Sequence, residues 1–208
     1  MSKEDSIVII DYGMGNLNSV KRKLHLLNIN ALVSSDINEV KSASKLILPG
    51  VGHFANAMKN LKDLGFIDIL NQKVLVEKTP ILGICLGMQI MAKKSEEGNC
   101  PGLGWFDADV VKFNMKDKLK YKIPQIGWNQ IAIEKSSKLM HSIPDYSEFY
   151  FVHSFHFRCN NKIDILNTTD YELNFTSAVE KNNIFGVQYH PEKSHDVGLQ
   201  MITNFITL

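Results

Sequence analysis

The sequence predicts an α/β fold with a mostly parallel central sheet, helices on both faces of it, and antiparallel strands in the second half. Short apolar runs alternate with helix-periodic segments in the first half, and this alternation is typical of parallel strands buried on both faces. From Trp105 onward, strand-like segments follow one another across short turns, which is typical of antiparallel pairing. No repeat, low-complexity tract or linker interrupts the 208 residues, so we expect a single domain (1–208).

The elements of the first half support the parallel sheet one by one. Ile7–Ile10 is an apolar run of strand length, residues 16–27 carry Val20 and Leu24 at helical spacing, and Asp36 is a suitable N-cap for the helix that follows it. Further strands are expected at Ala31–Ser34, 46–48 and 81–84. Further helices are expected at 37–43, 55–61, 67–76 and 88–94.

The second half is predicted to contain mostly strands. Polar turns such as Lys181-Asn182-Asn183 separate its strand-like segments, and a last apolar-periodic segment is expected to form a closing helix at about 196–206. The expected strands are 110–113, 130–134, 149–153, 176–180 and 184–188. In a doubly covered parallel sheet, functional residues gather at the carboxyl ends of the strands, so we expect the site there.

Composition excludes several classes of protein. The chain is 44% hydrophobic and carries a net charge of +1 with no basic run, which argues against nucleic acid as a partner. No apolar stretch approaches the roughly 20 residues of a membrane span, and residues 1–6 are charged rather than signal-like. Three cysteines at unrelated spacings indicate a reducing compartment, by default the cytoplasm, and form no metal-binding pattern.

Cys85 is the first candidate for chemistry. It follows the apolar run 80–82 and precedes a helix-like stretch, so the chain must turn there from a strand into a helix. We expect a cysteine at such an elbow to be exposed and to lie near a helix N-terminus, which favours the thiolate. Gly83 and Gly87 would permit the tight turn. On this segment alone, a buried structural cysteine is an equally good interpretation.

A histidine and a carboxylate near the C-terminus could complete a nucleophilic site. His190 closes a strand-like run, and Glu192 follows two residues later, so both side chains point to one side if the segment is extended. Pro191 favours the extended conformation at His190. Cysteine, histidine and glutamate together provide a nucleophile, a base and an orienting acid. The alternative is a surface histidine and a solvated glutamate beside a turn.

The third element is a turn that could bind an oxyanion. The apolar strand at 46–48 runs into Pro49-Gly50-Val51-Gly52, and turns of this kind expose backbone N–H groups. The N–H of Val51 and that of Leu86, directly after the cysteine, could hold a developing negative charge. An ordinary glycine turn between a strand and a helix explains the same residues.

Together these segments resemble a known family, the class I (triad-type) glutamine amidotransferases. The resemblance rests on Cys85 in Gly-x-Cys-Leu-Gly-x-Gln, on the distant His-Pro-Glu and on the Pro-Gly-x-Gly turn. More narrowly, the chain resembles the glutaminase subunits of imidazole glycerol phosphate synthases over about residues 7–205. The segments that carry this narrower resemblance are 11–17, 49–54, 127–129 and 150–154.

The resemblance implies a flavodoxin-like glutaminase domain with no cofactor and no metal. Cys85 would attack the side-chain carbonyl of glutamine, His190 would transfer protons, and Glu192 would orient the imidazole. Without the family, helix surface would be the favoured interpretation for Gln89, and a solvated acid would be favoured for Glu97. The residues that the resemblance assigns to substrate binding are Gly50, Gly52, Gln89, Glu97, His153, Ser154 and Phe155.

The resemblance also implies a partner. A (β/α)₈ cyclase subunit would form a heterodimer with this chain and receive the ammonia, making imidazole glycerol phosphate and aminoimidazole carboxamide ribotide. Trp128 and Lys193 match positions near that interface, although packing or plain surface charge would also explain them. Gln125 stands where the family commonly has histidine, and Phe155 stands where tyrosine is usual.

These departures leave a second interpretation of the partner open. Paralogous glutaminases supply ammonia to amidotransferases that build amidino sugars of surface polysaccharides, and this is the alternative partner. A non-catalytic regulatory subunit is disfavoured, because Cys85, His190 and Glu192 are all present.

Overall fold

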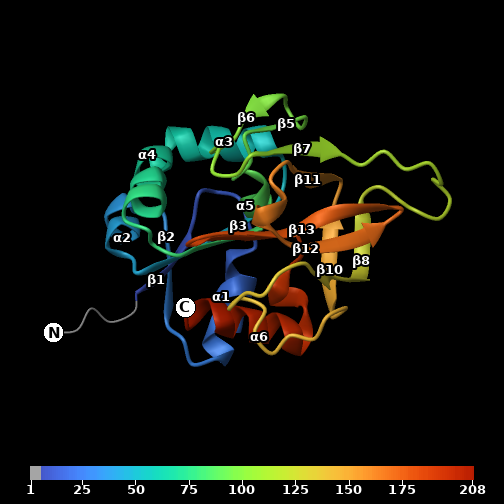
Figure 1. The fold of residues 1–208 in the computed structure, drawn as a ribbon. Helices are drawn as coiled ribbons and strands as arrows, with labels where there is room; N and C mark the ends of the chain where they lie inside the picture. Colours follow the sequence, from blue (N-terminus) through green and yellow to red (C-terminus); the bar gives the residue numbers. More distant parts are fainter. Residues whose placement is uncertain (1–5) are drawn as a thin grey trace.

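The computed structural model describes residues 6–208, so residues 1–5 of the charged N-terminal segment lie outside the described part. Its centre is a parallel sheet with the strand order β2-β1-β3-β4-β14 (Figure 1). This core confirms the predicted parallel arrangement. The strands are β1 (Ile7–Ile10), β2 (Ala31–Ser34), β3 (Lys45–Gly50), β4 (Ile81–Cys85) and β14 (Ile184–Val187).

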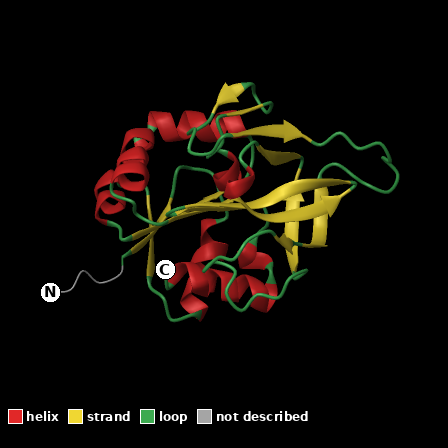
Figure 2. Ribbon diagram, in the orientation of Figure 1, coloured by secondary structure: helices red, strands yellow, loops and turns green. Residues whose placement is uncertain are grey.

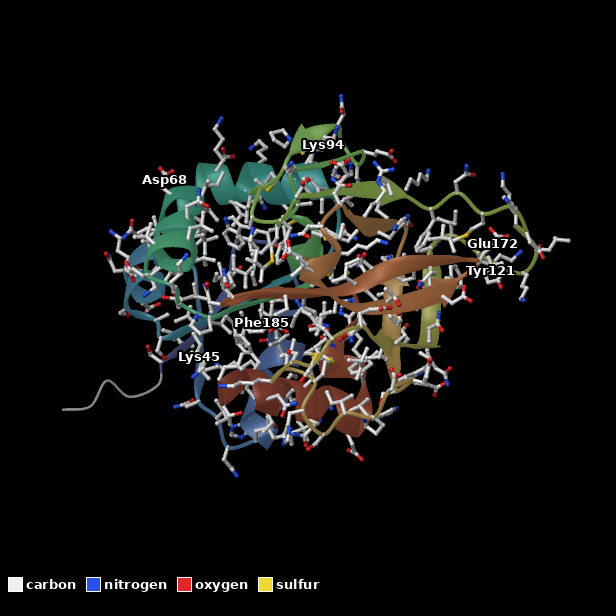
Figure 3. All side chains as sticks on the ribbon, in the orientation of Figure 1. Lys45, Asp68, Lys94, Tyr121, Glu172 and Phe185 are labelled. Carbon is white, nitrogen blue, oxygen red and sulfur yellow. The ribbon has the colours of Figure 1, made fainter. Side chains whose placement is uncertain are left out.

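Helices cover both faces of this sheet (Figure 2). Val8 and Ile10 of β1 pack in one hydrophobic cluster with α2, α3 and α4, whereas Ile7 and Ile9 pack in another with α1 and α6. Phe185 points toward α6, where its ring lies 6.1 Å from that of Phe205 (Figure 3). The helices are α1 (Leu17–Leu26), α2 (Ile37–Ser42), α3 (Phe54–Asp63), α4 (Phe66–Asn71), which continues into the π-helical turn η1 (Gln72–Val76), and α6 (His195–Ile206).

The N-cap of α2 provides a test of local stability. The Asp36 carboxylate accepts a hydrogen bond of 2.7 Å from the N–H of Asn38, as its position predicts. Replacing Asp36 by alanine is expected to lower the free energy of unfolding by about 1 kcal/mol, whereas asparagine still caps and should cost much less. Urea unfolding of both variants measures this, and equal losses would contradict the capping role.

The second half extends the sheet with antiparallel strands, as predicted. β13 pairs with β14, β12 and β11, and β11 pairs in turn with β7. β8 and β10 form a separate two-stranded sheet. The longer strands are β7 (Ala108–Lys112), β8 (Gln125–Gln130), β10 (Glu148–His153), β11 (Phe155–Cys159), β12 (Ile165–Tyr171) and β13 (Leu173–Lys181). The shorter elements are β5 (Lys94–Ser95), β6 (Cys100–Pro101), β9 (Ala132–Ile133) and the 3₁₀ turn η2 (Lys162–Asp164).

The turn between β12 and β13 holds the long loop that follows β7. The Glu172 carboxylate accepts hydrogen bonds of 2.6 and 2.7 Å from the N–H groups of Lys116 and Asp117. Tyr121 packs edge-on against Tyr171, with ring centroids 5.1 Å apart, and Figure 3 shows Tyr121 and Glu172 together at this end of the molecule. No helix in residues 6–208 has the length and apolar character needed to span a bilayer.

Two predicted elements are wrong. The helix predicted at 88–94 is only one turn, α5 (Leu86–Gln89). It ends because the carbonyls of residues 90–92 accept hydrogen bonds from the N–H groups of residues 103–105 instead of from further turns of helix. The strand predicted at 130–134 is divided at Ile131. Before this residue β8 pairs with β10, and after it β9 pairs with β12.

Candidate active site

The carboxyl ends of three neighbouring strands form the site. β3 ends at Gly50, β4 ends at Cys85, and these two residues are partners in the register of the parallel pair. β14, on the other side of β4, ends at Val187 and leads within three residues to His190. Adjacent parallel strands bring their carboxyl ends to one edge, so residues remote in sequence meet there.

Cys85 occupies the predicted strand-to-helix elbow. Its backbone has φ 55° and ψ −110°, a conformation that L-residues adopt at a cost and that tends to be found at functional sites. The prediction that this cysteine is exposed is wrong, because its residue surface is 6% exposed. Residues of β10 lie over it, and the Val152 carbonyl oxygen is 3.9 Å from Sγ. Cys85 still lines the cavity described below.

His190 and Glu192 form a buried pair. His190 Nδ1 lies 2.7 Å from Glu192 Oε1, and both residues are less than one-tenth exposed. His190 is extended, as expected before Pro191, but Glu192 belongs to the 3₁₀ turn η3 (Pro191–Lys193), so the turn and not strand periodicity brings the two together. The His190 N–H donates to the Tyr150 carbonyl, which ties this segment to β10.

The charges around His190 favour its protonated form. Burial lowers the pKa of the imidazole, but interactions with Cys85 and with Glu192 outweigh burial and raise this pKa to about 10. Nδ1 is engaged by Glu192, and Nε2 has no partner at hydrogen-bond geometry among the described residues. The arrangement therefore leaves one imidazole nitrogen available to exchange protons with the sulfur or with a bound molecule.

A cavity of about 430 Å³ opens over Cys85. Pro124, which the sequence did not indicate as a site residue, contributes to its wall, and so does Val152, from the strand segment that the resemblance expects to complete the pocket. His190, Glu192, Gly50 and Trp128 do not line it. The predicted site residues that do line it are Val51, Gly52, Cys85, Leu86, Gln89, Glu97, His153, Ser154, Phe155 and Lys193.

The Pro49 to Gly52 turn lies against the elbow. A Cβ at Gly50 would come within 2.3 Å of the Tyr12 hydroxyl and 3.0 Å of the Gly87 nitrogen, so only glycine allows this approach. Gly52 has φ +106°, in the region that favours glycine. Val51 between them is 42% exposed and lines the cavity, as does Leu86, the residue directly after Cys85.

Gln89 and Glu97 both line the cavity and are held by different hydrogen bonds. Gln89 is buried rather than on a helix surface, and its Nε2 donates to the Phe155 carbonyl at 3.0 Å and to Gln188 Oε1 at 2.9 Å. Glu97 reaches the start of α3, where its Oε2 accepts a hydrogen bond of 2.8 Å from the Phe54 N–H. Both side chains line the cavity, and Glu97 leaves its second oxygen outside that bond.

His153 is held by its neighbours in a neutral form. Burial is the main cause that lowers its pKa, to about 3, and its Nδ1 lies 2.7 Å from the Phe155 carbonyl. The rings of Phe113 and Phe175 pack against it at 5.2 and 5.4 Å. Gln125, directly across the β8–β10 pair, is 3% exposed, and its Oε1 has no hydrogen-bond partner among the described residues.

An exposed aromatic group lies near Lys193, which lines the cavity. Trp128, which is 44% exposed, stacks on His195 with ring centroids 4.7 Å apart and an interplanar angle of 3°. Trp128 also contacts Tyr150, and Lys193 Nζ lies 5.4 Å from the centroid of the Tyr150 ring. The sequence indicated Trp128 and Lys193 but not His195. In residues 6–208, no cluster of three or more histidine, cysteine, aspartate or glutamate side chains could hold a metal ion.

The chain is similar to known proteins over nearly its whole length. The family model described as glutamine amidotransferase class-I matches residues 8–208. The chain is 52% identical to "Imidazole glycerol phosphate synthase subunit HisH 2" of Methanococcus maripaludis, over 96% of this chain and 98% of that one. It is 43% identical to the protein of the same name from Pseudomonas aeruginosa, over 97% and 99%. It is 45% identical to "Imidazole glycerol phosphate synthase subunit HisH 1" of Campylobacter jejuni, over 97% and 100%.

Solved structures resemble the fold at lower identity. "Structure of PurLQS from Thermotoga maritima" has a TM-score of 0.72 at 15% identity and covers 98% of each chain. "Crystal structure of glutamine amidotransferase" has a TM-score of 0.71 at 19% identity and covers 97% of this chain and 99% of that one. At these identities the structures support the fold and nothing narrower.

Proposed function

The chain belongs to the class I glutamine amidotransferase family, and from this premise we propose that it is the glutaminase subunit of an imidazole glycerol phosphate synthase in histidine biosynthesis. The observation that carries the chemistry is Cys85 at a strand-to-helix elbow, facing a cavity, together with a buried His190–Glu192 pair whose imidazole interacts with Cys85. The names of the relatives support the choice of synthase.

The proposed reaction uses the triad in two half-reactions. The Cys85 thiolate attacks the side-chain carbonyl carbon of glutamine, and the N–H groups of Val51 and Leu86 hold the negative charge that develops on oxygen. The C–N bond then breaks as the His190 imidazolium gives its proton to the departing nitrogen, which leaves as ammonia. His190 next takes a proton from water, whose oxygen attacks the thioester, and glutamate leaves as the thiolate is restored. Glu192 keeps the imidazole in orientation through Nδ1.

The cavity suits an amino acid with its side-chain amide directed at Cys85. Both N–H donors of Gln89 are already engaged inside the protein, so Gln89 would offer its Oε1 as an acceptor to the substrate's ammonium group. The carboxylate of Glu97 favours the same cation. Gly50, Gly52 and the backbone of residues 153–155 would complete the pocket.

A docked cyclase would explain why Ile126 and Trp128 are exposed. Ammonia in neutral water is mostly protonated and loses its nucleophilicity, so a glutaminase gains by passing it directly into a partner. Ile126 and Trp128 of β8 are 63% and 44% exposed, and Ile126 pairs with Val152, which lines the cavity. Exposed apolar groups of this kind mark interaction surfaces. We propose that a (β/α)₈ cyclase binds there in a heterodimer, with Lys193 and Trp128 at the contact.

A second candidate follows from the two departures from the family pattern. Gln125 is buried directly opposite His153, and Phe155 lines the cavity, so both substitutions lie beside the substrate pocket and not at a remote surface. A glutaminase that serves a sugar amidotransferase would keep the triad and differ around it. The partner assay below separates the two candidates.

The test is glutamate release with each partner. The full chain, mixed with a (β/α)₈ cyclase, its aminoimidazole carboxamide nucleotide substrate and glutamine, is expected to form glutamate and imidazole glycerol phosphate in equal amounts. An ammonium salt in place of glutamine should support synthesis by the cyclase alone. Glutamate release with a sugar amidotransferase, and none with the cyclase, would support the second candidate. Release with neither partner would contradict both.

A further inference from the structure

Gln188 is a buried side chain to which the proposed triad assigns no role. It directly follows β14, its N–H donates to the Ser177 carbonyl at 2.8 Å, and it is 0% exposed. Its side chain runs toward the nucleophile, where Nε2 lies 3.6 Å from Cys85 Sγ. Its Oε1 accepts the hydrogen bond of 2.9 Å from Gln89 Nε2.

The orientation of the Gln188 amide follows from its neighbours. The Phe155 carbonyl can only accept, so the Gln89 atom 3.0 Å from it must be the amide nitrogen. That nitrogen also contacts Gln188, and the Gln188 atom it meets must therefore be an acceptor, Oε1. The remaining Gln188 atom is the NH₂ group, and this is the group that faces Cys85. Gln89 thus donates to Phe155 and to Gln188, and Gln188 donates in turn to Cys85.

We propose that Gln188 donates a hydrogen bond to the Cys85 thiolate and fixes the position of this thiolate relative to Gln89, the proposed substrate-binding residue. The inference rests on the proposed function, because it takes Cys85 as the nucleophile. Gln188 is a second stabiliser of the sulfur's charge beside the His190 imidazolium, and it links that charge to the part of the pocket that holds the amino acid.

The physical reason lies in what each form of the sulfur requires. A thiol can donate its proton toward the Val152 carbonyl, 3.9 Å away, but a thiolate has no proton and is repelled by that oxygen. A thiolate requires donors, and hydrogen bonds to ions in a buried site are roughly twice as strong as neutral ones. The Gln188 NH₂ group has no competing acceptor among the described residues, so its donation goes to the sulfur.

Alkylation of Cys85 as a function of pH tests the proposal. Cys100 and Cys159 are changed to serine, so that only Cys85 reacts with iodoacetamide, and the rate is measured in this background and in its Gln188→Met derivative. Methionine has a similar length and no donor. The midpoint of the pH–rate profile is expected to rise by about one pH unit, which corresponds to about tenfold less thiolate near neutral pH.

Two further variants keep the result interpretable. Gln188→Glu keeps the shape and the acceptor for Gln89 but places a carboxylate oxygen at the sulfur, so its midpoint should rise further than that of Gln188→Met. Thr169→Val is the matched control, because it removes a buried hydrogen bond to Ser177, the residue whose carbonyl accepts from the Gln188 N–H, and leaves the Gln188 side chain and Cys85 unchanged. Its profile should equal that of the parent.

Specific outcomes would overturn the proposal. Gln188→Glu and Gln188→Met profiles that coincide with the parent, in protein that melts normally, would show that the sulfur does not use this donor. An equal shift in Thr169→Val would show a packing effect instead. The alkylation rates do not depend on glutamine turnover, so they can fail or succeed independently of the proposed glutaminase activity. The Cys85→Ala variant tests that activity.

Discussion

Replacing Cys85 by alanine is expected to lower the rate of glutamine hydrolysis by at least about 10⁴-fold, because removal of the nucleophile from a triad leaves only the modest contribution of binding and oxyanion stabilisation. No other cysteine can substitute, since Cys100 and Cys159 do not line the cavity. The measurement is glutamate release in the complex with the proposed partner.

Two controls define this result. Cys159→Ala removes a thiol from β11, outside the cavity, and should keep the wild-type rate. The complex that contains Cys85→Ala should still make product from an ammonium salt, because the partner's chemistry does not need the sulfur. Glutamate release by the Cys85→Ala complex at a rate near wild type would remove the proposed mechanism.

The parallel half of the fold was predictable because its signals are local. The apolar runs of β1 and β4 are buried on both faces, so hydrophobic residues in sequence are sufficient to identify them. Asp36 could be identified as a cap from its residue type and position alone. The positions of Cys85 and His190 follow from the same logic, since Cys85 ends β4, His190 lies three residues beyond the end of β14, and adjacent parallel strands end together.

Other elements depend on contacts that no local pattern records. β12 carries Asn167, Thr168 and Thr169 in its buried part, and this polarity conceals a strand. Distant groups satisfy these side chains: the Tyr189 hydroxyl donates to Asn167, and Thr169 donates to Ser177. Polar residues of this kind are acceptable in a core only once their partners are in place.

The same reason explains what was missed or wrong in the site. Gln188 meets Cys85 across 103 positions of sequence, and its place beside a histidine motif gives no sign of where its amide points. Cys85 would be exposed in an isolated elbow. In the fold it is buried, because β10 lies over it and the Val152 carbonyl faces the sulfur. His195 stacks on Trp128 from the first turn of α6, a contact that depends on how α6 docks on the sheet.

Replacing Gly87 by alanine is expected to destabilise the protein by more than about 3 kcal/mol, because overpacking against fixed atoms exceeds the ordinary cost of an added methyl. A Cβ at Gly87 would lie 1.7 Å from the Leu48 carbonyl oxygen and 2.8 Å from the carbon of the same group. These are backbone atoms of β3, so no side-chain rotation relieves the contact. Helix α5 would have to move off β3.

That movement would also reach the chemistry, since α5 begins directly after Cys85 and carries the Leu86 N–H. We therefore expect Gly87→Ala protein that remains folded to have lost most of its glutaminase activity. Urea unfolding is compared with Gly104→Ala, where φ is +71° but nothing lies within 4 Å of the added Cβ, so only backbone strain of about 1–2 kcal/mol applies. Equal midpoints for the two variants would mean that α5 does not rest on β3 as closely as the elbow requires.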